Sequence, residues 1–235
     1  MIALGNFLFR YRNALFPLTC VLLFLPGPRL HPEPLLAAAI GAAITLSGQI
    51  VRALTIGLEY IVRGGRQGKV YADGLVIAGL YHHCRNPMYV GNVLIAAGLA
   101  VASNSWTTIV VAIPSVILAY SAIIAAEEKY LSEKFGDAYA EYRRDVPRWL
   151  PRTRGLAKTF ADSDFHWRRV IVKEYGTAAG WIGVLCGVVL YNLWRGDLWE
   201  LRRDQVFAIV WIVSVTFALW LLARVLKKTH FLEAD

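Results

Sequence analysis

Long apolar blocks alternate with shorter polar segments along the chain. Six of these blocks approach the roughly 20 residues that a helix needs to cross a bilayer. They cover residues 14–25, 35–58, 89–102, 106–126, 176–194 and 206–226, and the first is short enough that we expect it to extend backwards through Phe7–Arg12. Only Ser103–Ser105 separates the third block from the fourth, so these two spans are predicted to form a tight antiparallel hairpin. The pattern predicts an all-α, polytopic integral membrane protein with about six transmembrane helices.

Composition agrees with this fold class. The 235 residues are 57% hydrophobic and only 18% charged, whereas a soluble domain is usually about one quarter charged. The net charge is +8, but the basic residues lie between apolar blocks, which favours an anionic lipid surface over nucleic acid. Three cysteines, Cys20, Cys84 and Cys186, are far apart in the sequence and indicate neither a disulfide framework nor a metal site.

The distribution of Lys and Arg predicts the orientation in the membrane. Segment 59–85 carries four of these residues and segment 127–175 carries eleven. Cytoplasmic loops are enriched in Lys and Arg, so we predict that both polar segments and both termini are cytoplasmic. The opposite side carries Arg29 and a last loop with Arg195, Arg202 and Arg203, which departs from the pattern.

A candidate site precedes the third span. After Pro87 this span has about 15 apolar residues, or roughly 22 Å at 1.5 Å per residue, against a hydrocarbon core of roughly 30 Å. Polar residues 81–86 should therefore be recessed at the cytoplasmic interface, where irregular backbone is tolerated if it lines a cavity. Arg85 and the first amides of the helix suit an anion, and Tyr81 and Tyr89 suit a cation. The alternative is an aromatic and basic belt that only anchors the span.

A second cluster, Glu127 and Glu128, ends the fourth span. Carboxylates at the membrane surface are costly unless they are paired or face a polar cavity; the alternative is a solvated helix face. The hairpin places this cluster on the same side as Arg85, so the two clusters can close on one pocket for a zwitterionic or cationic ligand. The helix should continue to Phe135 and stop at Gly136, with a short amphipathic piece over residues 137–144.

Other motifs are weaker. Residues 64–69 look like a phosphate cradle but lack its Lys-Ser/Thr ending. The adjacent His82 and His83 cannot both face one metal from a helix, and we predict no metal site. Cys84 stands beside Arg85, which could lower its pKa, but a passive thiol is the favoured interpretation.

Taken together, the motifs resemble a known family. Residues 75–91, which include Arg85-Asn86-Pro87-Met88-Tyr89, and residues 127–148, which begin with Glu127-Glu128, occur in the order and at the separation typical of isoprenylcysteine carboxyl methyltransferases. Related membrane phospholipid methyltransferases share this core. The resemblance covers about residues 55–151 and implies a helical membrane enzyme with a cytosolic pocket for S-adenosylmethionine.

Residue chemistry adds two predicted catalytic residues. Arg85, with the first amides of the helix, suits the cofactor's carboxylate, and His83 is the candidate base if the acceptor is an amine or a thiol. The remaining cofactor contacts implied by the resemblance are Leu75, Val76, Tyr81, Asn86, Pro87, Met88, Tyr89, Glu127 and Glu128.

Three features depart from the family's pattern, and the second of them weakens the case for a prenylcysteine carboxylate as the acceptor. Asn86 stands where the family usually has His, and Ile123 stands where the carboxyl methyltransferases place a substrate-binding Arg. We predict a methyltransferase core over residues 1–154, followed by a basic linker and two added spans over residues 155–235. The added spans are candidates for a lipid entrance or for a contact within a homo-oligomer.

The predicted function is methyl transfer from S-adenosylmethionine to a lipophilic or membrane-embedded acceptor, such as an isoprenylcysteine-type carboxylate, a phospholipid or another lipid head group. The alternative is a non-catalytic membrane protein, either a small transporter or an assembly factor. A transporter should carry charged or broken positions midway along several spans. Here the spans are nearly free of charge in the middle, with Arg52 as the main exception, and this favours the enzyme.

Overall fold

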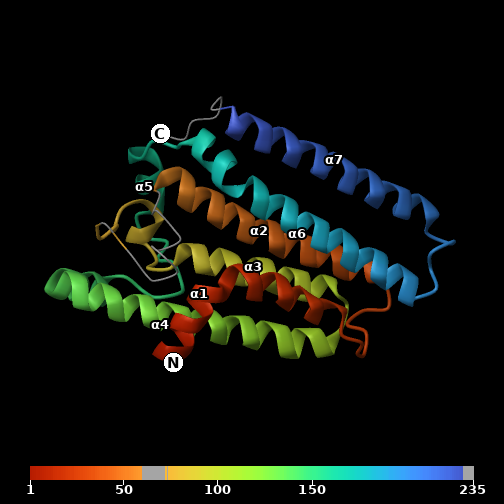
Figure 1. The fold of residues 1–235 in the computed structure, drawn as a ribbon, viewed down its shortest axis with the longest axis horizontal. Helices are drawn as coiled ribbons and strands as arrows, with labels where there is room; N and C mark the ends of the chain where they lie inside the picture. The colour runs from red at the N-terminus through yellow and green to blue at the C-terminus, as the bar shows by residue number, and fades with distance from the viewer. Residues whose placement is uncertain (60–71, 73, 230–235) are drawn as a thin grey trace.

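The computed structural model describes residues 1–59, 72 and 74–229, and this part of the chain is helical without a β-strand. Figure 1 shows long helices lying side by side along one axis. The predicted all-α class is confirmed. The elements, in order, are α1 (Ile2–Thr19), η1 (Cys20–Phe24), α2 (Pro34–Leu58), η2 (Gly79–His82), α3 (Pro87–Ala102), α4 (Trp106–Asp145), α5 (Leu156–Asp162), α6 (Trp167–Arg195) and α7 (Arg203–Lys228).

Four helices, α2, α4, α6 and α7, are long and apolar enough to cross a membrane. A fifth candidate is the N-terminal pair Ile2–Arg12 and Pro17–Phe24, which is bent by 92°. Pro17 accounts for the bend because proline inside a helix lacks a donor N–H and clashes with the preceding turn. Helix α3 is a shorter apolar helix of 16 residues. Every predicted span is therefore helical, while four or five helices, rather than six, meet the length criterion for a crossing.

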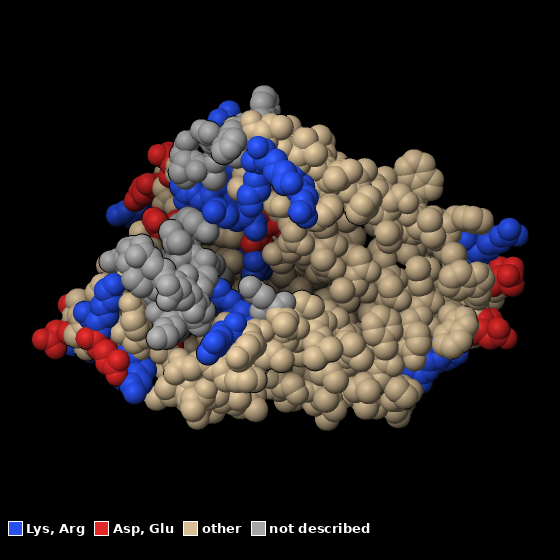
Figure 2. Space-filling view, in the orientation of Figure 1, with Lys and Arg blue, Asp and Glu red and all other residues tan. Residues whose placement is uncertain are grey.

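On the face shown in Figure 2, charged residues gather toward the two ends of the molecule, and a broad uncharged surface lies between them. This distribution and the long apolar helices are those of a multi-pass integral membrane protein. We call the end at which Ser103–Ser105 joins α3 to α4 the turn end, and the opposite end, where α4 extends beyond its neighbours, the loop end (Figure 1).

Glycines allow α2 and α3 to approach closely. A Cβ atom on Gly41 or Gly98 would collide with the backbone of the facing helix, and Gly48 and Gly91 face each other in the same way. The hydroxyl of Thr45, between these two contacts, donates to the carbonyl of Gly41 at 2.8 Å. Small residues at such an interface are typical of helix packing in membranes, because close backbone contact supplies the dispersion energy that the hydrophobic effect does not.

The two C-terminal helices differ in how deeply they pack. Val188 of α6 is fully buried in one apolar cluster with Leu99, Ala100 and Ala102 of α3, and Leu23 and Ala112 complete the buried part of that cluster. By contrast, only 6% of the apolar window of α7 is buried. Helix α6 is thus a structural part of the bundle, and the division of the chain at residue 154 stays a prediction.

Helix α4 runs past the bundle and bends at Gly136, whose φ of 52° and ψ of −123° are not helical. A side chain is strained in that conformation, so glycine suits the position. The sequence prediction of a stop at Gly136, followed by a second amphipathic piece, is confirmed. After this bend the chain turns back toward the start of α3.

Candidate functional site

The site lies at the loop end, where α3 begins beside α4. Pro87 occupies the first turn of α3, where a missing N–H costs nothing. The amides of Tyr89 and Val90 donate to the carbonyl of Asn86 at 3.0 and 3.1 Å. Because these first-turn amides already have an acceptor, the positive charge offered to an anion here comes mainly from arginine side chains.

Two arginines flank the buried carboxylate of Glu128. Arg85 approaches Oε1 of Glu128 at 3.4 Å, while Arg148 donates from Nε to Oε1 at 3.1 Å and from its terminal nitrogen to Oε2. The hydrogen bonds to Glu128 raise the pKa of Arg148 above the usual value of an arginine. Within the described residues, Nε of Arg85 is buried without a hydrogen-bond partner. Arg85 therefore keeps a buried donor that Glu128 does not use.

Glu127, the neighbouring carboxylate, contacts Tyr89 at the start of α3. The hydroxyl of Tyr89 donates to Oε1 of Glu127 at 2.6 Å, which links the start of α3 to α4 as the hairpin predicted. The ring of Tyr89 lies 5.1 Å from that of Tyr120, centroid to centroid. The result is an aromatic surface with a fixed carboxylate at its edge, which suits a positively charged group.

The segment after α4 closes over this pair of helices. The amide of Arg85 donates to the carbonyl of Pro147 at 2.9 Å, and Nδ2 of Asn86 donates to the carbonyl of Arg148 at 3.1 Å. The thiol of Cys84 lies 3.2 Å from the carbonyl of Trp149, and burial raises its pKa from 9.0 to about 11. Cys84 is therefore a passive thiol, as the sequence favoured, and the backbone on both sides of Arg85 is held in place.

His83 is also held rather than exposed. Its side chain is buried, with Nδ1 at 2.9 Å from the carbonyl of Arg152 and Nε2 at 2.7 Å from the hydroxyl of Thr159. A carbonyl only accepts, so Nδ1 of His83 donates to Arg152. Both ring nitrogens thus have partners within the chain, and they lie on the side of residues 152–159 rather than of Glu127.

The structure does not gather all of the predicted cofactor contacts. Arg85, Asn86, Tyr89, Glu127 and Glu128 meet at the site. Buried Tyr81 adjoins it through its carbonyl, which accepts from the hydroxyl of Tyr142 at 2.7 Å. Met88 packs instead in a cluster with Ile56 and Val170. Leu75 and Val76 are half-buried in the segment before η2, and Pro87 is buried at the start of α3. Residues 64–69, the weak phosphate motif, lie outside the described residues.

Sequence reasoning missed some residues that build the site. Arg148 is the last residue of the second motif, and no role was predicted for it, although it makes the closest contact with Glu128. Its 20-residue separation from Glu128 depends on the bend at Gly136, which the motif alone does not place in space. In the described part of the chain, no group of three or more His, Cys, Asp and Glu residues could hold a metal ion.

An apolar groove of about 510 Å³ lies between η1, α3 and α4, and its lining includes Ala96, Val116 and Ala119. Ala96 and Val116 also pack in the apolar cluster that contains Tyr120 and touches Tyr89. The groove therefore adjoins the aromatic wall of the site from the side of the membrane.

Comparison with known proteins agrees with this geometry. The family model described as phospholipid methyltransferase matches residues 36–138. The cobalt-zinc-cadmium resistance protein CzcN of Cupriavidus metallidurans is 31% identical over 159 residues, which are 64% of this chain and 68% of that protein. The chain belongs to the family of isoprenylcysteine and phospholipid methyltransferases of membranes. The name of this relative refers to metal resistance.

Two further relatives match over a shorter stretch. The nickel-cobalt-cadmium resistance protein NccN of Alcaligenes xylosoxydans xylosoxydans is 35% identical over 78 residues, which are 33% of this chain and 36% of that protein. The protein-S-isoprenylcysteine O-methyltransferase of Schizosaccharomyces pombe is 34% identical over 77 residues, which are 33% of each chain. This chain thus spans about a third of the length of these two relatives. No solved structure matches it.

Proposed function

We propose that this protein transfers a methyl group from S-adenosylmethionine to a lipophilic or membrane-embedded acceptor at the cytosolic face of the membrane. The observation that carries the proposal is the charge-separated site at the start of α3. Arg85 and Arg148 supply two positive charges there, and Glu127 and Glu128 supply two negative ones. Membership of a membrane methyltransferase family supports the same reaction class.

The residues present fit this cofactor. Its amino acid part is a zwitterion beside a sulfonium, so it needs a cationic donor, a carboxylate and an aromatic face within one site. The buried Nε of Arg85 has no partner among the described residues and would donate to the cofactor's carboxylate. Glu127, fixed by Tyr89, would accept from the amino group or the ribose hydroxyls. The rings of Tyr89 and Tyr120 would face the sulfonium.

When bound, S-adenosylmethionine supplies a methyl group on a positively charged sulfur for an in-line displacement. The protein's task is then to position the two partners and to keep water out. The segment after α4 covers the site from the loop end, and the apolar groove admits a lipid chain from the side. A carboxylate or phosphate acceptor needs no base, and the internal partners of both His83 nitrogens favour such an acceptor. The role of His83 as a base stays a prediction.

The cytosolic location of the site is part of the proposal. Lys and Arg gather over the loop end in Figure 2, and the first turn of α6 and the last turn of α7 contribute Arg168, Arg169, Lys227 and Lys228. With the loop end in the cytoplasm, a water-soluble cofactor reaches the site directly, and both termini are cytoplasmic. Reporter fusions at Ser103–Ser105 and after Lys228 would test this, because the orientation requires opposite readouts at the two positions.

The experiment measures binding and transfer separately. S-adenosylhomocysteine is titrated into detergent-purified wild type, Arg85→Gln and Glu127→Gln, with Glu133→Gln as the matched control because Glu133 is exposed on the same helix. Losing a charged hydrogen bond weakens binding by about 1.5–3 kcal/mol, so we expect a drop of at least about tenfold for the two site variants. Affinities within twofold of wild type for both would contradict the proposed pocket.

Transfer is followed with labelled S-adenosylmethionine and membrane lipid extracts. Ala119→Phe fills the groove, whereas Leu118→Phe adds the same ring on the exposed neighbouring position. We expect Ala119→Phe to reduce labelling of the lipid acceptor and to leave S-adenosylhomocysteine affinity unchanged. Equal labelling in the two variants would exclude the groove as the acceptor's route. Cofactor binding without any labelled lipid, across extracts of several compositions, would favour the non-catalytic alternative.

A further inference from the structure

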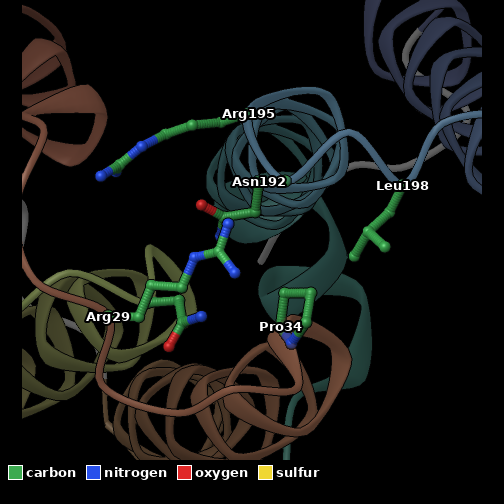
Figure 3. Close-up of a pocket in the computed structure, with 7 residues that line it drawn as sticks. Arg29, Pro34, Asn192, Arg195 and Leu198 are labelled. Carbon is green, nitrogen blue, oxygen red and sulfur yellow. The ribbon is translucent and has the colours of Figure 1, made fainter.

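A second pocket lies at the turn end, far from the site described above. It is a shallow pocket at the surface, lined by residues from the segment before α2, the turn between α3 and α4, and the end of α6. Figure 3 shows Arg29 extending toward Asn192 of α6, with Pro34 and Leu198 on the other walls. Three separate chain segments therefore surround one polar cavity.

The charge of this pocket is positive and is not balanced from within. Its lining includes Arg29 and Arg195 but no acidic residue. Among the described residues, the guanidinium of Arg29 has no ion pair or hydrogen bond, while Arg195 donates to the carbonyl of Gly27 at 2.9 Å and keeps its other donors. Glu33, the acidic neighbour of Pro34, pairs with Arg202 at 2.8 Å and caps the amide of Leu35.

Hydrogen bonds that do not involve the Arg29 side chain hold the polar residues of the pocket in place. Nδ2 of Asn192 donates to the carbonyl of Ala102 at 3.0 Å. The side chain of Asn104 bonds to the backbone of His31 through both its oxygen, at 2.8 Å, and its nitrogen, at 2.9 Å. These bonds hold the helix ends together, so the pocket does not need the Arg29 side chain for its shape. Arg29 is therefore available to a ligand.

Aromatic side chains place this pocket at the level of lipid head groups. Trp106, Trp194 and Trp199 are exposed around the turn end, and such residues are enriched where a protein crosses the membrane–water interface. With the loop end cytoplasmic, as proposed above, Arg29 and Arg195 lie on the opposite side, which runs against the usual charge distribution of membrane proteins. A local anionic ligand explains why both of them line one pocket here.

We propose that this pocket binds the phosphate of an anionic phospholipid head group in the leaflet opposite the methyl-transfer site. Arg29 is the principal donor, and Arg195 adds a second positive charge at the rim. A planar guanidinium binds phosphate oxygens in pairs. The absence of a carboxylate from the lining favours a net anionic lipid over a zwitterionic one.

The experiment counts bound lipid by native mass spectrometry of the purified protein. Phosphatidylglycerol and phosphatidylcholine are titrated separately into wild type, Arg29→Gln and Arg195→Gln. Arg203→Gln is the matched control, because Arg203 lies at the same end, stacks near Phe207 and does not line the pocket. We expect Arg29→Gln to weaken phosphatidylglycerol binding about tenfold, which corresponds to about 1.4 kcal/mol. Arg195→Gln should have a smaller effect, and Arg203→Gln none.

Two controls distinguish the outcomes. S-adenosylhomocysteine affinity reports folding of the distant site and should be unchanged in all three variants; if wild type itself does not bind it, the thermal unfolding midpoint serves instead. Inorganic phosphate is titrated in parallel. Phosphate binding that depends on Arg29, without any preference for phosphatidylglycerol, would overturn the lipid assignment in favour of a free anion. Equal phosphatidylglycerol binding in Arg29→Gln and Arg203→Gln would overturn the site.

Discussion

Removing the charge of Glu174 should destabilise the protein strongly, because Glu174 is the counter-charge of Arg52, which is buried between the helices. Nε and a terminal nitrogen of Arg52 donate to its two carboxylate oxygens at 2.7 and 2.6 Å. Gln49 donates to the same carboxylate at 2.9 Å, and Arg52 also donates to Asn92 of α3. The pair therefore ties α6 to α2 and α3, and Glu174→Gln would leave Arg52 without a counter-charge.

The magnitude follows from burial. The side chains of Arg52 and Glu174 are only 11% and 5% exposed, and removing one partner of a buried ion pair costs about 3–5 kcal/mol. The matched control is Glu133→Gln, which breaks the Lys129–Glu133 pair whose side chains are 54% and 66% exposed. Such exposed pairs contribute about 0.2–1 kcal/mol before screening by salt.

Unfolding is followed by tryptophan fluorescence in mixed dodecyl maltoside and sodium dodecyl sulfate micelles. We expect Glu174→Gln to lower the free energy of unfolding by at least about 3 kcal/mol, and the double variant Arg52→Met/Glu174→Leu to recover part of the loss because no charge stays buried. A Glu174→Gln loss as small as that of Glu133→Gln would show that the buried ion pair does not stabilise the fold. A double variant no more stable than Glu174→Gln would show that the cost is not the stranded charge.

Two further predictions concern the loop end. Gly136→Ala should lower stability by about 1–3 kcal/mol through backbone strain, since no atom would crowd the added Cβ; an unchanged unfolding midpoint would exclude strain. Because burial raises the pKa of the Cys84 thiol from 9.0 to about 11, its contribution to stability is complete below pH 9 and is lost as the pH rises toward 11. In a Cys20→Ser/Cys186→Ser background, iodoacetamide should label Cys84 slowly at pH 8 until the protein is unfolded, and rapid native labelling would contradict this.

The parts of the fold that the sequence predicted depend on local signals. Apolar length located the helices, the short Ser103–Ser105 turn required an antiparallel hairpin, and Gly136 marked the bend in α4. The hairpin then brought Tyr89 to Glu127, where the two side chains form a hydrogen bond. Periodicity did not show the bend at Pro17, because an apolar stretch is equally apolar whether the helix is straight or kinked.

The remaining parts of the site depend on long-range packing. Arg148 reaches Glu128 only because the chain turns back after α4, and the sequence gives no distance for that return. Met88 follows Pro87 directly in the motif, yet its helical position turns it toward Ile56 and Val170. His83 looks like a base by its residue type, whereas the fold supplies partners for both of its ring nitrogens. The surroundings of these side chains depend on which face of each helix packs against another part of the chain.

The central claim is that the start of α3 and the adjacent part of α4 bind S-adenosylmethionine. The most direct test is calorimetric titration of the folded, detergent-purified wild type with S-adenosylhomocysteine, which the enzyme would release as product. We expect saturable binding at one site per chain with a micromolar dissociation constant. No heat of binding, from protein with an intact cooperative unfolding transition, would contradict it and leave the non-catalytic membrane protein as the better interpretation.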